Sequence, residues 1–551
     1  MAVRRKVREA PVGQQLRLFV GDEKANPGAS ASRERPLFRM GHKESLYFGG
    51  LLVQTYLKEH AQLLPFVVED VLESCDLSSL ERAYSTKGRP PYHPKLMLGM
   101  ILYALIRGQA TLRDMELLAR LDLGMMYLGG GISPDHSSFG RFIARHLECL
   151  NEGLVEMLVS AVIQKSGSGL GTLSGDGTII ESCASQYGLL RKEAAAARSK
   201  QKATEAAYSR DSKPKKKQAE LAKLAADILD KRVASRRAQG KDPSTLRIAP
   251  SDPEASVQKT KSKTTRPSYK ASILANECRF IVSYAVDPTS ETSVVGGMLD
   301  QANRVGLALY GDTENVADTL LLDGGYLCET VLERAIQDDV NVLIPPRGTT
   351  QNCAGSKYSK DKFKFEEDDD VYICPMGVRL ISTGGWTGEE QPRKAYSSKE
   401  CRECPVVGDC TKSKTRQRRV RRYKVDELKE ALKEVMENPR ARKAYSMRKA
   451  VVEPVFSVFR GPMKFTRFLR RGLKNVAGEF GLRALAYNIR NLVRYARFVA
   501  KAAGLPGSIR SPYPTFPGRD GSRVVLAQLT LTVLMEDGVV FASMGRPLAR
   551  G

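Results

Sequence analysis

Two short segments each place an acid directly before a glycine, at the end of a predicted strand. They are Asp176-Gly177, within Thr172–Ile180, and Asp323-Gly324, after an apolar run. Ligands collect at the strand ends of open α/β sheets, and small neighbours let a metal ion and a phosphate approach the backbone closely. Two adjacent carboxylates repel each other unless a divalent cation lies between them, and oxygen-only ligation suits Mg²⁺ or Mn²⁺. The pair predicts a metal site, although a single Asp-Gly is also a common turn.

A third acid, Glu453, stands next to Pro454 and between Arg448 and Arg460. Proline is usual in the first turn of a helix, so we expect Glu453 at the start of one. The two arginines are suited to holding phosphate oxygens. Taken alone, Glu453 is better explained as an acid that complements the helix dipole.

A cysteine cluster with one CxxC spacing lies further back in the chain, followed by a dense basic run over 412–422. Four thiolates are enough for a tetrahedral structural Zn²⁺ site, and the alternative is four reduced, unliganded cysteines. The basic run predicts contacts with DNA, and the alternative is flexible, solvated charge. The cysteines are Cys374, Cys401, Cys404 and Cys410, and the candidate DNA-binding arginines of the run are Arg418, Arg419, Arg421 and Arg422.

The composition fits a partner that is a polyanion. In 551 residues there are 87 Lys and Arg against 62 Asp and Glu, a net charge of +25. Such a surplus favours binding to nucleic acid through phosphate contacts, and the alternative is a basic protein without that role. No apolar run reaches the ~18–20 residues of a membrane helix, and the N-terminus lacks a signal-peptide core. Ten cysteines in so long a chain are not a secreted disulfide framework, so we expect a cytoplasmic protein.

The elements that must position these residues fall into several predicted parts. Residues 1–40 are a flexible basic arm, and 41–168 form an all-α domain. Within it, Thr111 is a candidate N-cap, and a helix from Pro134 carries the candidate DNA-binding residue Arg141. Helix, turn and basic helix indicate a helix-turn-helix-like DNA reader, with a plain helical bundle as the alternative.

After residue 168, strands alternate with helices, which predicts an α/β core. Its first part covers 169–350 and contains a Lys- and Ala-rich helical insertion at 189–265. A cysteine-containing basic insertion covers 351–425, and 426–505 returns to helices that complete the core and carry Glu453. Residues 506–551 form a tail.

The combined motifs resemble the bacterial insertion-sequence DDE transposases, in the branch with a Tyr–Arg–Glu–Lys signature and near the eleven-eighty-two group. The resemblance covers roughly residues 41–500. The catalytic acids of that family correspond to Asp176 in Ser-Gly-Asp-Gly-Thr, Asp323 in Leu-Asp-Gly-Gly-Tyr and Glu453 in Val-Val-Glu-Pro-Val-Phe. The signature's Tyr and Arg fall on Tyr445 and Arg448. Its Lys falls near Arg460, a departure that keeps the charge and changes the hydrogen-bonding geometry.

The resemblance implies an RNase H-like core that brings the three acids together around Mg²⁺ or Mn²⁺. It implies two-metal cleavage and strand transfer at the ends of a mobile element, with double-stranded DNA as partner and a homodimer in synapsis. Tyr445, Arg448 and Arg460 would then contact DNA. The alternatives are a catalytically silent DNA-binding descendant and a structure-specific nuclease on the same fold.

Overall fold

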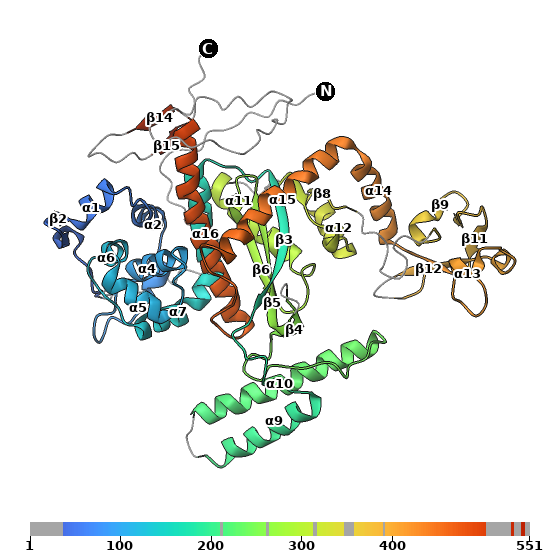
Figure 1. Ribbon diagram of the computed structural model, residues 1–551, viewed down its shortest axis with the longest axis horizontal. Helices are drawn as coiled ribbons and strands as arrows, with labels where there is room; N and C mark the ends of the chain where they lie inside the picture. The colour runs from blue at the N-terminus through green and yellow to red at the C-terminus, as the bar shows by residue number, and fades with distance from the viewer. Residues whose placement is uncertain are drawn as a thin grey trace, which may run out of the picture. The chain divides into compact units, whose positions relative to one another are not determined.

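The computed structural model describes residues 37–209, 213–260, 264–311, 317–345, 357–388, 392–502, 530–533 and 542–545. The chain divides into two compact units. The first comprises Met1–Asp318 and Lys449–Gly551, and the second comprises Thr319–Arg448. The division falls inside one helix, α15 (Pro439–Arg460). Figure 1 shows the elements in chain order, and the architecture mixes helices with sheets.

The first unit begins with a helical bundle around α4 (Pro94–Ile106). This helix is apolar on nearly all sides and is buried from Met97 to Ile106, as expected of a central bundle helix. Its first residue is Pro94, in the helical turn where a missing N–H costs least. The rest of the bundle consists of η1 (Lys43–Ser45), β1 (Tyr47–Phe48), β2 (Leu51–Leu52), α1 (Val53–Glu59), α2 (Leu64–Glu73), α3 (Ser78–Glu81), α5 (Leu112–Leu121), α6 (Leu123–Gly129), α7 (His136–Cys149), the π-helical turn η2 (Leu150–Leu154) and α8 (Val155–Ser166).

The predicted cap of α5 is confirmed in full. Asp114 N–H donates to the Thr111 hydroxyl at 3.1 Å, and the Asp114 carboxylate accepts from the Thr111 N–H, which makes a capping box. Asp135 caps α7 by accepting from Ser138 N–H at 2.6 Å. The short helix α6 lies between α5 and α7 and was not predicted, so the connection between them is longer than the turn we expected.

The sheet of the first unit is antiparallel. β3 (Thr172–Glu181) pairs along its length with β5 (Thr265–Asn276), and β5 pairs on its other edge with β4 (Ser256–Lys259) and β6 (Ile281–Asp287). α11 (Val295–Tyr310) packs on β6 and on α8. The register places Asp176 opposite Ile273 and Ser174 opposite Ala275. This register decides which β5 side chains share a face with Asp176.

The long helix α16 (Leu473–Ala502) joins the bundle to the sheet by packing on α4, α8 and β6. Leu485 and Ile489 belong to its apolar face and are fully buried. Arg483 also lies in the interior of the unit. It is 2% exposed, donates to Glu479 at 3.1 Å and lies 3.9 Å from the ring centre of Phe465. The apolar surroundings leave this guanidinium no route to solvent.

The insertion between β3 and β5 is helical, as predicted, and it forms a hairpin of α9 (Lys192–Ala207) and α10 (Lys213–Ala238) (Figure 1). Its small core contains Ala195, Ala225, Leu229 and Ile248. Leu224 on α10 is 41% exposed. Pro214 stands at the second position of α10, where a missing N–H costs nothing, so it opens this helix rather than breaking one.

The second unit contains a parallel pair and an antiparallel sheet. β7 (Thr319–Leu321) and β8 (Asn341–Leu343) are parallel, and they are connected through η3 (Gly324–Tyr326) and α12 (Glu329–Gln337). The antiparallel sheet has the order β13-β12-β11-β10-β9 and was not predicted. Its strands are β9 (Lys364–Glu366), β10 (Val371–Ile373), β11 (Arg379–Ser382), β12 (Arg393–Ser397) and β13 (Val420–Tyr423). The short helix η4 (Lys360–Lys362) precedes β9, and η5 (Lys399–Arg402) and α13 (Val407–Cys410) lie between β12 and β13. The helix α14 (Val425–Glu437) follows β13.

Two terminal predictions fall mostly outside the described residues. Of the predicted arm at 1–40, only 37–40 are described. In the tail, β14 (Thr530–Val533) and β15 (Ala542–Gly545) form an antiparallel pair. Across the described ranges, every helix is either too short or too polar to cross a lipid bilayer.

The buried pair on α16 gives a stability prediction. Glu479→Ala would leave Arg483 charged and buried without its partner, and would remove the acceptor of Leu469 N–H, now at 2.9 Å. We expect a loss of about 3–5 kcal/mol in the free energy of unfolding, measured by urea denaturation followed by circular dichroism. The control Glu148→Ala breaks an exposed pair with Lys474 and should change stability by less than about 1 kcal/mol. Equal effects of the two variants would contradict this account.

Candidate active site and nucleic-acid interface

Asp176 lies near the middle of β3, half-buried, and not at the strand end that the sequence suggested. One of its carboxylate oxygens accepts from Gly177 N–H at 2.9 Å. Because side chains alternate along a strand, Ser174, Asp176 and Thr178 share one face of the sheet. Ala275, opposite Ser174 on β5, shares that face as well.

The glycine beside Asp176 has a different use from the one predicted. A Cβ on Gly177 would lie 2.9 Å from the carboxyl carbon of Glu291, on the face of β3 opposite to Asp176. Glu291 in turn lies 3.7 Å from the ammonium group of Lys270. Gly177 therefore makes room for a protein carboxylate on the other face. No local pattern indicated this contact, because Glu291 lies in the loop after β6.

The C-terminal half of α15 packs on the face of the sheet that carries Asp176. Val451 and Val452 form a buried cluster with Ala275. Glu453 follows directly, with an exposed side chain. The prediction that Glu453 starts a helix was wrong: α15 begins at Pro439 and runs through Pro454. The packing of the buried residues around Pro454 outweighs its missing N–H, and the proline in the first turn is Pro439.

Arg460 connects this helix to the strand of Asp176. Its guanidinium donates to the Thr178 hydroxyl at 2.6 Å. Glu453 and Arg460 are seven residues apart, which is close to two helical turns, so they lie on the same side of α15, about 10.5 Å apart along its axis. Asp176 and Thr178 are about 6.6 Å apart along β3. Asp176 and Glu453 therefore belong to the same junction of helix and strand. Thr178 was not singled out from the sequence, although its spacing of two from Asp176 indicated a shared face.

Asp323 belongs to the second unit. It follows β7 and caps η3, where its carboxylate accepts from Gly325 N–H at 2.6 Å. The predicted order of buried strand, acid and glycine turn is confirmed locally, since Leu320 and Leu321 are buried. The next turn is anchored by Tyr326, which is 1% exposed. Asp323 is thus held in a defined geometry on its own unit.

The basic run divides into structural and exposed arginines. Arg422 is 8% exposed, donates to Glu430 at 3.0 Å and lies 3.6 Å from the ring centre of Phe365. Arg418 donates to the carbonyl of Cys410 at 3.2 Å. Both guanidinium groups are held within the second unit. Arg419 and Arg421, which alternate with the buried residues, are exposed.

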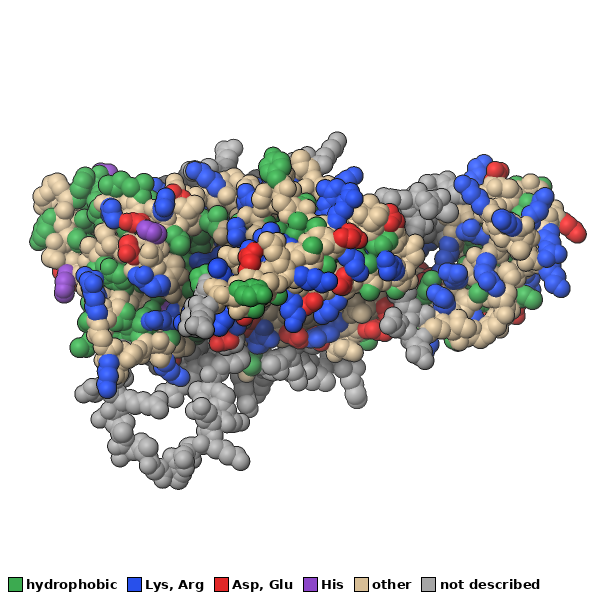
Figure 2. All heavy atoms as spheres, turned by 90° about the horizontal axis from the view of Figure 1, so that it is seen from below, with side chains coloured by type: hydrophobic (Ala, Val, Ile, Leu, Met, Phe, Trp, Pro, Cys, Tyr) green, Lys and Arg blue, Asp and Glu red, His purple; other side chains and the backbone are tan. Residues whose placement is uncertain are grey.

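An open groove of about 300 Å³ runs along β13. Its lining is strongly basic, and the residues are Lys360, Arg418, Arg419, Val420, Arg421 and Tyr423. β13 is an edge strand of its sheet, so the groove is not covered by another strand of that sheet. Figure 2 shows Lys and Arg side chains gathered over the module of β9 to β13. The groove is thus a concentration of positive charge on the second unit.

The remaining candidate DNA contacts differ in exposure. Arg141 on α7 is exposed, and its side chain donates to Ser138 at 3.0 Å. Arg448 is only 6% exposed and lies 5.9 Å from the ring centre of the partly buried Tyr445. Contact of Arg448 with a phosphate would require its side chain to move, whereas Arg141 and Arg460 are exposed as they stand.

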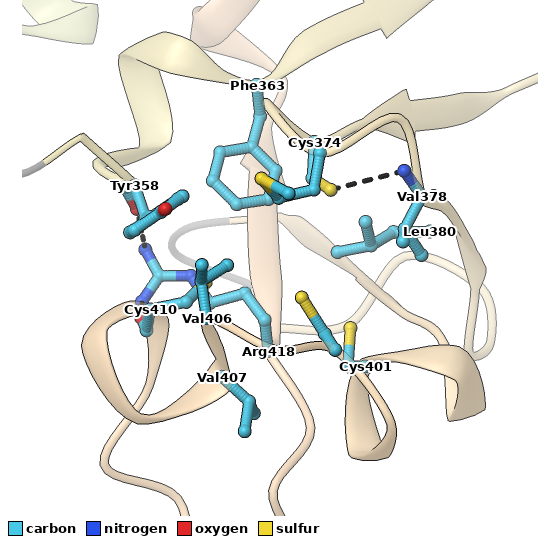
Figure 3. A pocket seen from close by; sticks show the side chains of 12 residues that line it. Tyr358, Phe363, Cys374, Val378, Leu380, Cys401, Val406, Val407, Cys410 and Arg418 are labelled. Atoms are coloured by element: carbon cyan, nitrogen blue, oxygen red, sulfur yellow. Dashed lines mark hydrogen bonds between the residues drawn. The ribbon is translucent and has the colours of Figure 1, made fainter.

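The four cysteines of the predicted cluster all line one small cavity of the second unit (Figure 3). Burial raises the pKa of the Cys410 thiol, while the guanidinium of Arg418 lowers it and the other three cysteines raise it further. Over the described ranges, no three or more His, Cys, Asp or Glu side chains already have the spacing of a metal site. The structure thus brings the four cysteines together without arranging their sulfur atoms as ligands.

Two family models match the chain. A transposase domain (DUF772) matches residues 57–145, in the helical bundle, and a transposase DDE domain matches residues 373–493. The two matches support an insertion-sequence transposase family. The second also supports an enzyme of the nuclease and transposase kind, a class that acts on DNA and generally uses divalent metals. No curated protein and no solved structure matches the chain.

The contact between Arg460 and Thr178 can be tested by a double-mutant cycle. Thr178→Val removes the acceptor, and Arg460→Met removes the donor to the buried Thr178 hydroxyl. We expect a coupling of about 1 kcal/mol in the free energy of unfolding. The control cycle replaces Arg460→Met by Lys449→Met, an exposed change earlier on α15, and should give no coupling. A coupling near zero in the first cycle would show that α15 does not pack on β3 in this way.

Proposed function

We propose that the protein is a transposase that binds the terminal inverted repeats of a mobile element and cuts and joins their DNA strands. Asp176, Asp323 and Glu453 would hold Mg²⁺ or Mn²⁺. All three ligands are carboxylates, and a set of oxygen donors suits these hard cations. Asp176 and Glu453 belong to the first unit and Asp323 to the second. We therefore also propose that the three carboxylates come together around the same ions.

The observation that carries the proposal is the junction of α15 with β3. The Arg460–Thr178 hydrogen bond and the packing of Val452 on Ala275 support the proposal, because they set the helix of Glu453 against the strand of Asp176. Glu453 and Asp176 would then act at one surface of the first unit. Asp323 would complete the set if the parallel pair β7–β8 continues the antiparallel sheet, which is the RNase H-like arrangement we propose.

The chemistry is metal-assisted phosphoryl transfer. When bound, a pair of divalent ions activates water or a DNA 3′-hydroxyl and stabilises the leaving oxygen of an in-line displacement. The carboxylates of this chain would fix that pair between them. Arg460, exposed and anchored on Thr178, would orient a phosphate oxygen next to Glu453. Such positioning and charge stabilisation account for most catalysis of phosphoryl transfer.

Double-stranded DNA would contact exposed basic residues of both units. Arg419 and Arg421 line the basic groove, and Arg141 lies on α7 of the bundle. Bridging two element ends would require at least a homodimer. The protein would act on nucleoid DNA in the bacterial cytoplasm.

Neutral isosteres of the acids test the catalytic proposal. Asp176→Asn, Asp323→Asn and Glu453→Gln should each lower cleavage of a plasmid carrying the chain's gene and its native flanking DNA by at least about 100-fold, because one electrostatic stabiliser alone contributes about 10²–10³. DNA binding in a mobility-shift assay should persist. Chelation should stop cleavage, and added Mg²⁺ or Mn²⁺ should restore it.

The control Glu181→Gln removes an acid from the same strand, on the opposite face, where it pairs with Arg266 at 3.0 Å. It should keep normal cleavage. Wild-type protein that binds the flanking DNA and never cuts it would instead indicate a silent DNA-binding protein. Cutting without joined products would indicate a nuclease.

The basic groove gives a separate binding prediction. The double variant Arg419→Gln/Arg421→Gln should weaken DNA binding and reduce the slope of log K against log salt by about 2, since each lost phosphate contact removes about 0.9. The matched control is Arg379→Gln on the same sheet, whose side chain is already paired with Asp369. Fluorescence anisotropy over a range of salt concentrations measures both. An unchanged slope in the double variant would remove the groove from the DNA interface.

A further inference from the structure

Four cysteines line the cavity between the β10–β11 turn and the segment from η5 to α13. Its walls are apolar apart from Arg418 and Tyr358, and its volume is about 20 Å³. That is enough for one sphere of the size of a water molecule. An apolar cavity of this size offers a water too few hydrogen-bond partners, whereas the four cysteines that line it are ligands that suit a soft metal ion.

The first thiol comes from a tight turn. Cys374 follows β10 directly. Its N–H donates to the Val378 carbonyl at 3.0 Å, and its carbonyl accepts from Gly377 N–H at 2.9 Å. Gly377 has φ +80°, a conformation that other residues rarely adopt. Val378 N–H also donates to the Cys374 sulfur at 3.3 Å. A backbone donor of this kind stabilises a thiolate and orients it as a ligand.

The other three thiols come from a second compact segment. Cys401 is 7% exposed within η5, and Cys404 N–H donates to the Cys401 carbonyl at 3.3 Å. Val407 N–H donates to the Cys404 carbonyl at 3.1 Å, and Cys410 ends α13. In Figure 3, Cys374 lies on the turn above the cavity and Cys401 lies below it. Two rigid turns thus present cysteines to one space from different sides.

Arg418 supplies a positive charge to the same cavity. It lines the cavity, and its guanidinium donates to the Cys410 carbonyl at 3.2 Å and to the Tyr358 carbonyl at 3.4 Å. Four thiolates around a divalent ion carry a net charge of −2, which an adjacent guanidinium partly offsets.

We propose that Cys374, Cys401, Cys404 and Cys410 bind one structural Zn²⁺ that clamps the β10–β11 turn to the segment from η5 to α13. Small rotations of the four side chains toward the cavity would bring the sulfur atoms to the Zn–S distance of about 2.3 Å. The ion would have no open coordination position and therefore no catalytic role. Through Cys410 and Arg418, it would also fix the start of β13, where Arg419 directly precedes the strand and Arg421 lies within it. The site is independent of whether the chain cuts DNA.

Metal content tests the site directly. The full chain, purified under reducing conditions from zinc-containing medium, should carry about one zinc per chain by plasma mass spectrometry. Cys401→Ser and Cys410→Ser should lose most of it. The matched control Cys328→Ser should keep it, because Cys328 lies in the same unit outside the cluster, with its sulfur 3.3 Å from the Thr330 hydroxyl. Zinc that persists in both cluster variants would overturn the proposal.

A second measurement avoids variants that fail to fold. Wild-type protein stripped by a chelator should take up one Co²⁺ and develop the visible and charge-transfer bands of tetrahedral thiolate ligation. Fluorescence of the only tryptophan, Trp386, which lies between β11 and β12, should change on stripping and recover on metal addition. Absence of zinc and of the Co²⁺ bands, with the four thiols reactive or joined as disulfides, would show that the cluster is an ordinary cysteine-containing core.

Discussion

The packing of α15 on the β3–β5 face is the contact on which the candidate active site depends. Val452 and Val455 are fully buried and Phe459 nearly so, and burying such side chains contributes about 1.5–3 kcal/mol each. That apolar contact fixes the rotation of the helix, and the rotation puts Glu453 and Arg460 together on the exposed side. The hydrogen bond from Arg460 to Thr178 then sets the helix against the strand that carries Asp176. Carboxylates that repel each other are held near one surface by packing that involves neither of them.

The sequence predicted elements better than it predicted their junctions. The capping box at Thr111, the helical hairpin of α9 and α10 and the order of strand, acid and turn at Asp323 follow from local patterns, and the structure has them. Pro454 misled because a proline usually marks a helix start, while tertiary packing here carries the helix through it. The glycine at position 177 was assigned to ligand access, and its partner Glu291 is a long-range contact that no local pattern contains.

The number of arginines in a segment likewise does not predict which of them are exposed. The basic run predicted contacts with DNA, with solvated charge as the alternative, and neither reading distinguished its arginines. The alternation of a strand buries Arg422 and exposes Arg421. Arg483 and Arg418 likewise serve the interior, one in a pair with Glu479 and one beside the cysteine cavity. A net charge of +25 therefore overstates the number of cations available to a polyanion. The five-stranded sheet escaped prediction because its strands are short and its turns are rich in charge.

The central claim is that acids from both units share one metal site, and metal-directed backbone cleavage tests it most directly. Fe²⁺ would replace Mg²⁺ in the full chain bound to its flanking DNA, with ascorbate and peroxide to generate hydroxyl radicals that cut the nearest peptide bonds. Mass spectrometry of the fragments would then locate the cuts. The account predicts cuts next to Asp176, Asp323 and Glu453 in the same sample, all lost in Asp176→Asn. Cuts confined to one unit, or cuts that persist in Asp176→Asn, would contradict it.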